Sequence, residues 1–246
     1  MARGFAVRLH EAGWRKGDAV VFWGENRPEW IAAFWGCLLR GVIVVPIDYR
    51  SSPDFLLRVS HIVSAKLVLV GQDVPPLPVA PGQSVAPVWM LHELEWPDVD
   101  PPTLAPPAIT RDDVAEIIFT SGATAEPKGV VITHRNVLAN IVPVEREVLK
   151  YRKWSRPFAP IRFLNLLPLS HMFGQAMATF VPPMLGGVVV FMRGFNPIDI
   201  VAQVNTRRVS VVVCVPKILD VLREHVLRIA PEAASPSPKR HWLRRW

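Results

Sequence analysis

AVVFWGENRPEWIAAFWGCLLRGVIVVPI, residues 19–47, predicts a strand, a helix and a second strand in succession. Its first five residues are apolar and mostly β-branched or aromatic, which favours a strand. Asn26 is predicted to cap the helix that follows, Pro28 to occupy its first turn, and Gly41 to end it. Residues 42–47 are apolar on both faces, as in a buried parallel strand. This strand–helix–strand unit is typical of a doubly wound α/β sheet.

The same alternation continues towards the C-terminus. Residues 74–107 interrupt it, and their prolines predict a long surface connection with short extended pieces. We therefore predict an α/β fold of layered, mostly parallel sheets flanked by helices. The further predicted elements are helix 55–64, strand 66–70, strands 114–120 and 130–133, helix 134–150, strand 162–167, helix 172–184, strand 188–191, a helix from 197, strand 210–215 and a helix from 216.

The composition fits a globular domain with an anionic ligand. Half of the 246 residues are apolar, which is enough for one large or two small cores. Four of the basic residues behind the net charge of +7 lie in the tail KRHWLRRW at the C-terminus, so no nucleic-acid footprint is expected over the rest. We expect residues 1–230 to form the domain and residues 231–246 to be a poorly packed basic tail. Nucleic-acid or membrane-surface binding through that tail stays open as a weaker reading.

Two cysteines occur, and both lie in apolar runs. Cys37 and Cys214 are predicted to be buried side chains, which excludes a disulfide framework and a cysteine zinc site. This favours a reducing compartment, and we expect the cytoplasm. The longest apolar run, residues 30–39, is about half of what a membrane span needs, which leaves only peripheral membrane contact open.

The segment TSGATAEPKG, residues 120–129, carries the predicted chemistry. It lies between two predicted strands and is therefore expected to form a hairpin turn. Its lysine is followed by glycine, and its spacing is one residue too long, so it is not a strand–helix nucleotide loop. The plain alternative is a hairpin turn without function. The groups that could bind an anion are hydroxyls, flexible glycine backbone and one cation, from Thr120, Ser121, Thr124, Gly122, Gly129 and Lys128.

This segment resembles the phosphate loop of the acyl-adenylate-forming superfamily, which includes acyl-CoA synthetases and the adenylation domains of peptide synthetases. The usual pattern there is TSG-T-T-G-x-PKG. The chain departs at Ala123, which removes a hydroxyl, and at Ala125, which removes backbone freedom. Further stretches that resemble the family are residues 16–48, VVITHRNVLAN from residue 130, LLPLSHMFGQ from residue 166 and VCVPKIL from residue 213.

The resemblance implies activation of a carboxylic acid, expected to be a fatty acid, to acyl-AMP and then to a thioester with coenzyme A. The implied cofactors are ATP, Mg²⁺ and coenzyme A, and the implied partner is a small carboxylate. Lys128 and His171 are implied to be catalytic, and Thr124 to bind the metal. The implied ATP-binding residues are Thr120, Ser121, Gly122, Ala123, Thr124, Lys128 and Gly129.

Several family motifs are not found in these residues. They are the adenine-binding motif, the ribose-binding aspartate motif and the C-terminal lid domain with its lysine. We therefore expect the chain to be the first part of the large domain, with a second chain as one source of the remainder. The alternative is an inactive or split-enzyme module that binds nucleotide without chemistry.

Overall fold

Two sheets are built from the residues that the computed structural model describes, 1–77, 86–96, 104–120, 126–155 and 159–230. Of residues 151–155 it describes only the backbone. The strands are β1 (Ala19–Trp23), β2 (Ile43–Ile47), β3 (Leu67–Val70), β4 (Val88–Met90), β5 (Val114–Thr120), β6 (Lys128–Thr133), β7 (Arg162–Asn165), β8 (Val188–Val190) and β9 (Val211–Val213).

The larger sheet has the strand order β4-β3-β1-β2-β5-β6, and the smaller one has the order β8-β7-β9. Neighbouring strands are parallel except for β5 and β6, which form an antiparallel hairpin. The predicted fold of layered, mostly parallel sheets is confirmed. Because β1, β2, β3 and β5 run in one direction, their carboxyl ends meet at one edge of the sheet. Ligands of open α/β sheets bind at such edges.

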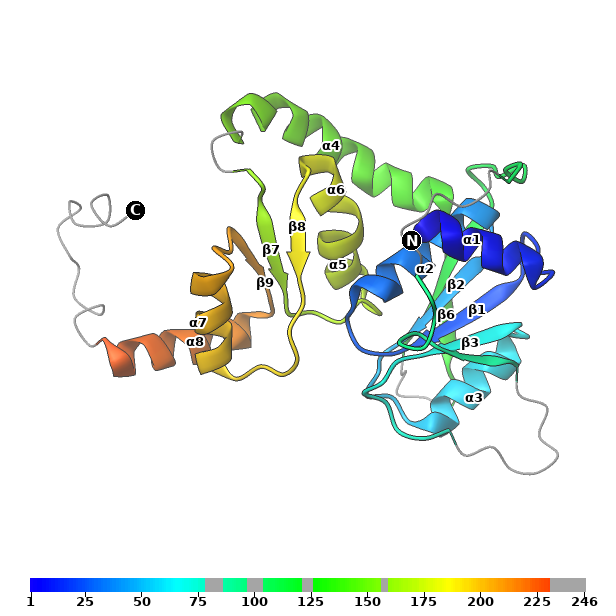
Figure 1. Cartoon of the computed structure of the whole chain (residues 1–246), viewed down its shortest axis with the longest axis horizontal. Coiled ribbons are helices and arrows are strands. Elements are labelled where there is room, and N and C mark those ends of the chain that lie inside the picture. Colours follow the sequence, from blue (N-terminus) through cyan, green and yellow to red (C-terminus); the bar gives the residue numbers. More distant parts are fainter. Residues whose placement is uncertain (78–85, 97–103, 121–125, 156–158, 231–246) are drawn as a thin grey trace.

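Helices flank both sheets (Figure 1). They are α1 (Ala2–Glu11), α2 (Pro28–Arg40), α3 (Pro53–Ile62), α4 (His134–Ser155), α5 (Met172–Gln175), the π-helix η2 (Ala176–Phe180), α6 (Val181–Leu185), α7 (Pro197–Thr206) and α8 (Pro216–Ile229). In Figure 1, α5 and α6 lie between β8 and the larger sheet. The long helix α4 contacts both β6 and α6 and so passes from one sheet to the other.

The ends of α2 agree with the sequence in two of three positions. Pro28 lies in the first turn, and Gly41 ends the helix in the left-handed region with φ of 65°. The prediction that Asn26 caps the helix is wrong. Arg27 is the N-cap residue, without a side-chain capping bond. The Asn26 carboxamide instead bonds to the backbone that follows β7, in the smaller sheet.

The helix predicted over residues 172–184 is divided into three short pieces. Pro182 and Pro183 have no N–H to donate to the preceding turn. The N–H of Val181 bonds to the carbonyl of Ala176, five residues back, which closes the wider turn of a π-helix. The α5 and α6 segments on either side of η2 are therefore short.

Aromatic side chains of α2 pack between the two sheets. The Phe34 and Trp35 rings lie 5.8 Å and 5.6 Å from the ring of Phe180 in η2, measured between centroids. Trp23 and Trp30 are fully buried in the larger sheet's cores, and Trp35 is half-buried.

Three further expectations concern burial and the membrane. Cys37 is buried and Cys214 is half-buried, and both are free thiols. Within the described ranges, none of the helices combines the length and the apolar character that crossing a bilayer requires. The basic tail, residues 231–246, lies outside the described residues.

Candidate functional site

The predicted phosphate loop lies at the turn between β5 and β6. Thr120, the last residue of β5, stands opposite Lys128, the first residue of β6, and both are exposed. The predicted placement of the loop on a β-hairpin is confirmed. The loop residues that lie outside the described part of the chain are Ser121, Gly122, Ala123 and Thr124, followed by Ala125.

Gly129 has a packing role that the sequence analysis did not predict. It lies inside β6, opposite Phe119, and it is not among the described glycines with positive φ. A Cβ atom at this position would come within 2.9 Å of Ile117 Cγ2 and 3.0 Å of Phe119 Cζ. Gly129, expected to supply flexible backbone to the turn, therefore lies within a regular strand instead. The missing side chain lets the larger side chains of β5 extend over β6.

His171 lies at a strand-to-helix turn, as predicted. It is the N-cap residue of α5, and its side chain is 62% exposed. Its Nε2 atom is 3.4 Å from Oδ2 of Asp48, the residue that directly follows β2. The His171 imidazole, on the segment that joins β7 to α5, therefore lies beside the carboxyl edge of the larger sheet.

Asp48 is the shared partner of Arg50 and His171. Its carboxylate accepts hydrogen bonds from Arg50 Nη2 at 2.9 Å and Arg50 Nε at 3.1 Å. Burial on its own would raise the pKa of Asp48. The hydrogen bonds and charge of Arg50, together with His171, outweigh burial and hold this pKa below its usual value. Asp48 is therefore ionised near neutral pH and orients both Arg50 and His171.

A cleft of about 600 Å³ lies between the carboxyl ends of β2 and β5 and the turn before α5. It brings Thr120 and His171 together, whereas Lys128 does not line it. The sequence analysis missed two guanidinium groups on its wall, Arg50 and Arg58, of which Arg58 also pairs with Asp54 at 3.1 Å. Its described lining residues are Pro46, Ile47, Asp48, Arg50, Ser51, Ser52, Phe55, Arg58, Ile118, Phe119, Thr120, Ser170 and His171.

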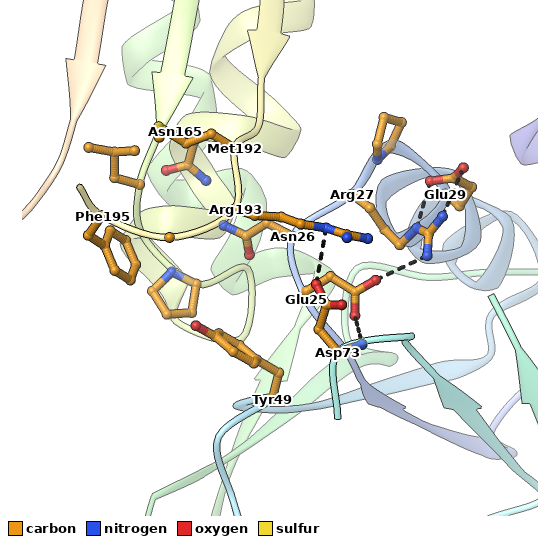
Figure 2. A pocket seen from close by; sticks show the side chains of 14 residues that line it. Glu25, Asn26, Arg27, Glu29, Tyr49, Asp73, Asn165, Met192, Arg193 and Phe195 are labelled. Carbon is orange, nitrogen blue, oxygen red and sulfur yellow. Dashed lines mark hydrogen bonds and ion pairs between the residues drawn. The ribbon is translucent and has the colours of Figure 1, made fainter. Parts of the chain in front are cut away.

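A second cavity, of about 360 Å³, lies where the two sheets meet (Figure 2). Its ionic side chains satisfy one another: Arg27 pairs with Glu25 at 3.0 Å and with Glu29 at 2.9 Å. Arg193, from the segment after β8, pairs with Asp73 at 3.2 Å. This cavity therefore presents charges that are already paired with one another. Glu25 and Asn26 also join separate parts of the chain, since Glu25 accepts from the N–H groups of Gln72 and Asp73 and Asn26 bonds to Leu167 and Leu169.

The described site thus combines a hairpin with an exposed lysine, a cleft with cationic walls and a histidine at a helix start. The sequence matches the family described as AMP-binding enzyme over residues 1–244. The chain belongs to the AMP-binding enzyme family. The match extends over both sheets, so the family assignment covers the elements that build the cleft.

Among AMP-binding enzymes, the chain is 27% identical over 218 residues to a feruloyl-CoA synthase of Amycolatopsis sp, covering 88% of this chain and 42% of that protein. It therefore spans less than half the length of this relative. The N-terminal domain of FACL13 from Mycobacterium tuberculosis has a TM-score of 0.72 at 25% identity, covering 96% of this chain and 58% of the solved one.

A third AMP-binding relative is the O-succinylbenzoate coenzyme A synthetase of Bacillus subtilis, solved in complex with ATP and magnesium ion. Its TM-score is 0.69 at 23% identity, and the match covers 90% of this chain and 57% of that chain. At this identity the likeness shows the fold alone. The fold found here is that of the N-terminal domains of adenylate-forming enzymes.

Proposed function

We propose that this chain supplies part of a site that activates a carboxylic acid with ATP. The carboxylate attacks the α-phosphate of ATP to give acyl-AMP and pyrophosphate. The thiol of coenzyme A then displaces AMP and forms a thioester. The family match, the coenzyme A synthase among the relatives and the relative solved with ATP and magnesium support this proposal.

One observation carries the proposal. Thr120, at the start of the phosphate-loop motif, and His171, from the second motif, lie on one cleft although they come from different sheets. Its described lining residues include two guanidinium groups, Arg50 and Arg58, and one carboxylate, Asp48, so positive charge predominates where an anionic substrate would bind. Two independent motifs that meet at the carboxyl edge of a parallel sheet fit one shared ligand better than two unrelated turns.

The described side chains divide the work by position. Lys128 is exposed at the hairpin and would stabilise negative charge on the pyrophosphate leaving group. His171 projects towards the cleft beside Asp48 and would orient the acyl carboxylate. Thr120 would donate its hydroxyl to a phosphate oxygen. The remaining ATP-binding residues that we propose are Ser121, Gly122, Ala123, Thr124 and Gly129.

We propose that Mg²⁺ binds at this site together with ATP. The described residues contain no group of three or more His, Cys, Asp or Glu side chains that could hold a metal ion. Mg²⁺ is usually bound through one or two protein groups together with substrate phosphates, so a dedicated cluster is not required. We propose that Thr124 holds the ion, which would neutralise phosphate charge.

The finer parts of the proposal concern substrate and location. We propose a fatty acid as the carboxylate. We also propose the cytoplasm as the compartment, because both cysteines are free thiols. Peripheral contact with a membrane through the basic tail remains part of the proposal. So does a division of the chain into the domain 1–230 and the tail 231–246.

A second candidate function is an inactive or split-enzyme module that needs a second chain and binds nucleotide without chemistry. It is favoured by β6, which forms one edge of the larger sheet and leaves Val130 and Val131 each 55% exposed. An exposed apolar edge strand is a template for pairing with a further strand. In this reading, the adenine-binding groups come from a second chain or from further residues of this protein.

Release of pyrophosphate distinguishes the two candidates. We expect the chain alone, given Mg-ATP and a fatty acid, to release no more pyrophosphate than its Lys128→Ala variant. Addition of a separately produced C-terminal half of FACL13 is expected to give release that depends on the acid. A coupled phosphate assay measures both.

The control is the same mixture prepared with the Lys128→Ala variant, which should stay at background. Turnover by the unmixed chain above this control would show that these residues complete the site without a partner. No acid-dependent release in any mixture would favour the binding module.

A further inference from the structure

The segment that carries His171, residues 166–171, is held by a side chain of the other sheet. Asn26 Nδ2 donates to the carbonyl oxygen of Leu167 at 2.7 Å. The N–H of Leu169 donates to Asn26 Oδ1 at 2.9 Å. The carboxamide thus bonds the segment on both sides and fixes its distance from β1.

A second carboxamide continues this arrangement into the core. Gln175, at the end of α5, is fully buried, and its Nε2 donates to Glu116 Oε1 at 2.6 Å and to the Leu169 carbonyl at 3.5 Å. Glu116 lies on β5, the strand that leads to Thr120, and is only 1% exposed. A buried glutamate therefore joins the phosphate-loop strand to the helix that starts at His171.

Two oxygen atoms of this pair lack a partner among the described residues. They are Glu116 Oε2 and Gln175 Oε1, and both are buried. An ionised carboxylate and a carboxamide oxygen can only accept, so neither can satisfy the other. A proton on Oε2 changes this, because the O–H can then donate to Gln175 Oε1. One proton closes a carboxylic acid–carboxamide pair with two hydrogen bonds and leaves neither oxygen orphaned.

We propose that Glu116 is a neutral carboxylic acid in slightly acidic solution and, paired with Gln175, positions the start of α5 relative to the phosphate-loop strand. Both are positioning residues, since they act through His171 and Thr120. The effect of the Glu116–Gln175 pair on catalysis rests on the proposed function, whereas the protonation of Glu116 does not depend on that function. Loss of the proton would leave a buried charge and loosen the junction that sets the width of the cleft.

The surroundings of Glu116 favour the neutral form. Burial raises its pKa to about 7, against a smaller lowering by the Gln175 hydrogen bond. Val44 of β2 and Ile132 of β6 are its neighbours in register on the adjacent strands. The titratable and charged groups packed near β5 lie towards its two ends and are Asp113, Lys16 and His134 at one end and Asp48, Arg50, His171 and Lys128 at the other.

The stability of the folded state depends on pH because Glu116 binds its proton more tightly in the folded than in the unfolded state. The carboxyl group has an ordinary pKa of 4.5 and a folded-state pKa of about 7. Between these values the folded state binds more protons than the unfolded state, so stability falls as the pH rises. The stabilisation is complete below the ordinary pKa and is lost as the pH passes through the folded-state value.

Glu116→Gln tests this directly, because a carboxamide keeps the shape and the pairing with Gln175 and cannot ionise. We expect its melting temperature to match that of the wild type at about pH 5 and to exceed it by several degrees at about pH 8. Glu145→Gln makes the same chemical change at an exposed glutamate of α4 and is the matched control. Curves for Glu116→Gln and wild type that stay parallel over this interval, as we expect for Glu145→Gln, would overturn the proposal.

Two spectroscopic measurements keep the proposal testable if the variant folds poorly. At about pH 6 the wild type should show the infrared band of a protonated carboxylic acid. This band should fade as the pH rises through about 7. The amide NMR signals of Leu167 and Leu169 should shift over the same interval, also in His171→Asn, and stay constant in Glu116→Gln.

An absent acid band, or amide shifts that disappear in His171→Asn, would assign the titration elsewhere and overturn the proposal. None of these measurements involves ATP. A failure of nucleotide binding would therefore leave their outcome unchanged, and the two proposals fail independently.

Discussion

Lys128→Ala is expected to weaken binding of Mg-ATP by about 10- to 100-fold. The ammonium group is exposed at the first residue of β6, directly opposite Thr120, where it can reach a phosphate bound by the loop. A hydrogen bond to a charged group contributes roughly 1.5–3 kcal/mol, and each 1.4 kcal/mol is about tenfold in affinity. Isothermal titration calorimetry of the wild type and the variant measures the difference.

Lys66→Ala is the matched control for this experiment. Lys66 is an exposed lysine that directly precedes β3 of the same sheet. It lies at the amino edge of the parallel strands, opposite the cleft. We expect its removal to leave the affinity for Mg-ATP unchanged. Equal losses in the two variants would mean that the lysines act only through the general charge of the protein.

Trp30→Ala is expected to have the largest effect on stability, a loss of about 3–5 kcal/mol in the free energy of unfolding. The side chain is 1% exposed. Its ring lies 5.1 Å from that of Phe22 on β1 and 5.6 Å from that of Phe34 on α2, between centroids. Truncation therefore removes aromatic contacts on two sides and leaves a cavity between helix and sheet. Denaturant unfolding followed by circular dichroism gives the change.

Trp35→Ala is the comparison for this prediction. Trp35 belongs to the same helix and contacts Phe34 and Phe180, but it is only half-buried. We expect a smaller loss than for Trp30, because solvent already reaches part of the ring. A loss at Trp30 no larger than at Trp35 would contradict the described packing of α2 against β1.

The elements that sequence predicted best are those set by local pattern. β1, β2 and β3 are apolar runs rich in β-branched residues, and each is found within a residue of its predicted bounds. Pro28 and Gly41 mark the ends of α2 because their backbone chemistry is the same in any fold. The turn at His171 was also predictable, since it lies between the predicted strand 162–167 and the predicted helix 172–184.

The errors arose where a distant part of the chain decides the outcome. Asn26 has a capping residue's side chain, yet its carboxamide bonds to Leu167 and Leu169, which lie far along the sequence. Gly129 was predicted to supply flexible loop backbone, whereas its lack of a side chain makes room for Ile117 and Phe119. Local propensity contains no information about either partner.

The cleft was only partly predictable for the same reason. Asp48 and Arg50 follow β2 in the sequence, and nothing local shows that β2 pairs with β5. The usable signal was topological, because polar residues after one parallel strand face those after its neighbours. Glu116 could have been noted as a lone charge within an apolar strand, but its partner Gln175 is known only from the fold.

The proposed function requires that the hairpin and His171 belong to one ATP site. Titration with Mn²⁺-ATP, a paramagnetic substitute for the magnesium complex, tests it through the broadening of backbone amide NMR signals. We predict that the amides of Thr120, Lys128 and His171 broaden together at low nucleotide concentration. The amides of Asp73 and Arg193, at the other cavity, should stay sharp. Broadening centred on Asp73 and Arg193, or confined to one of the two motifs, would show that the hairpin and His171 do not share an ATP site.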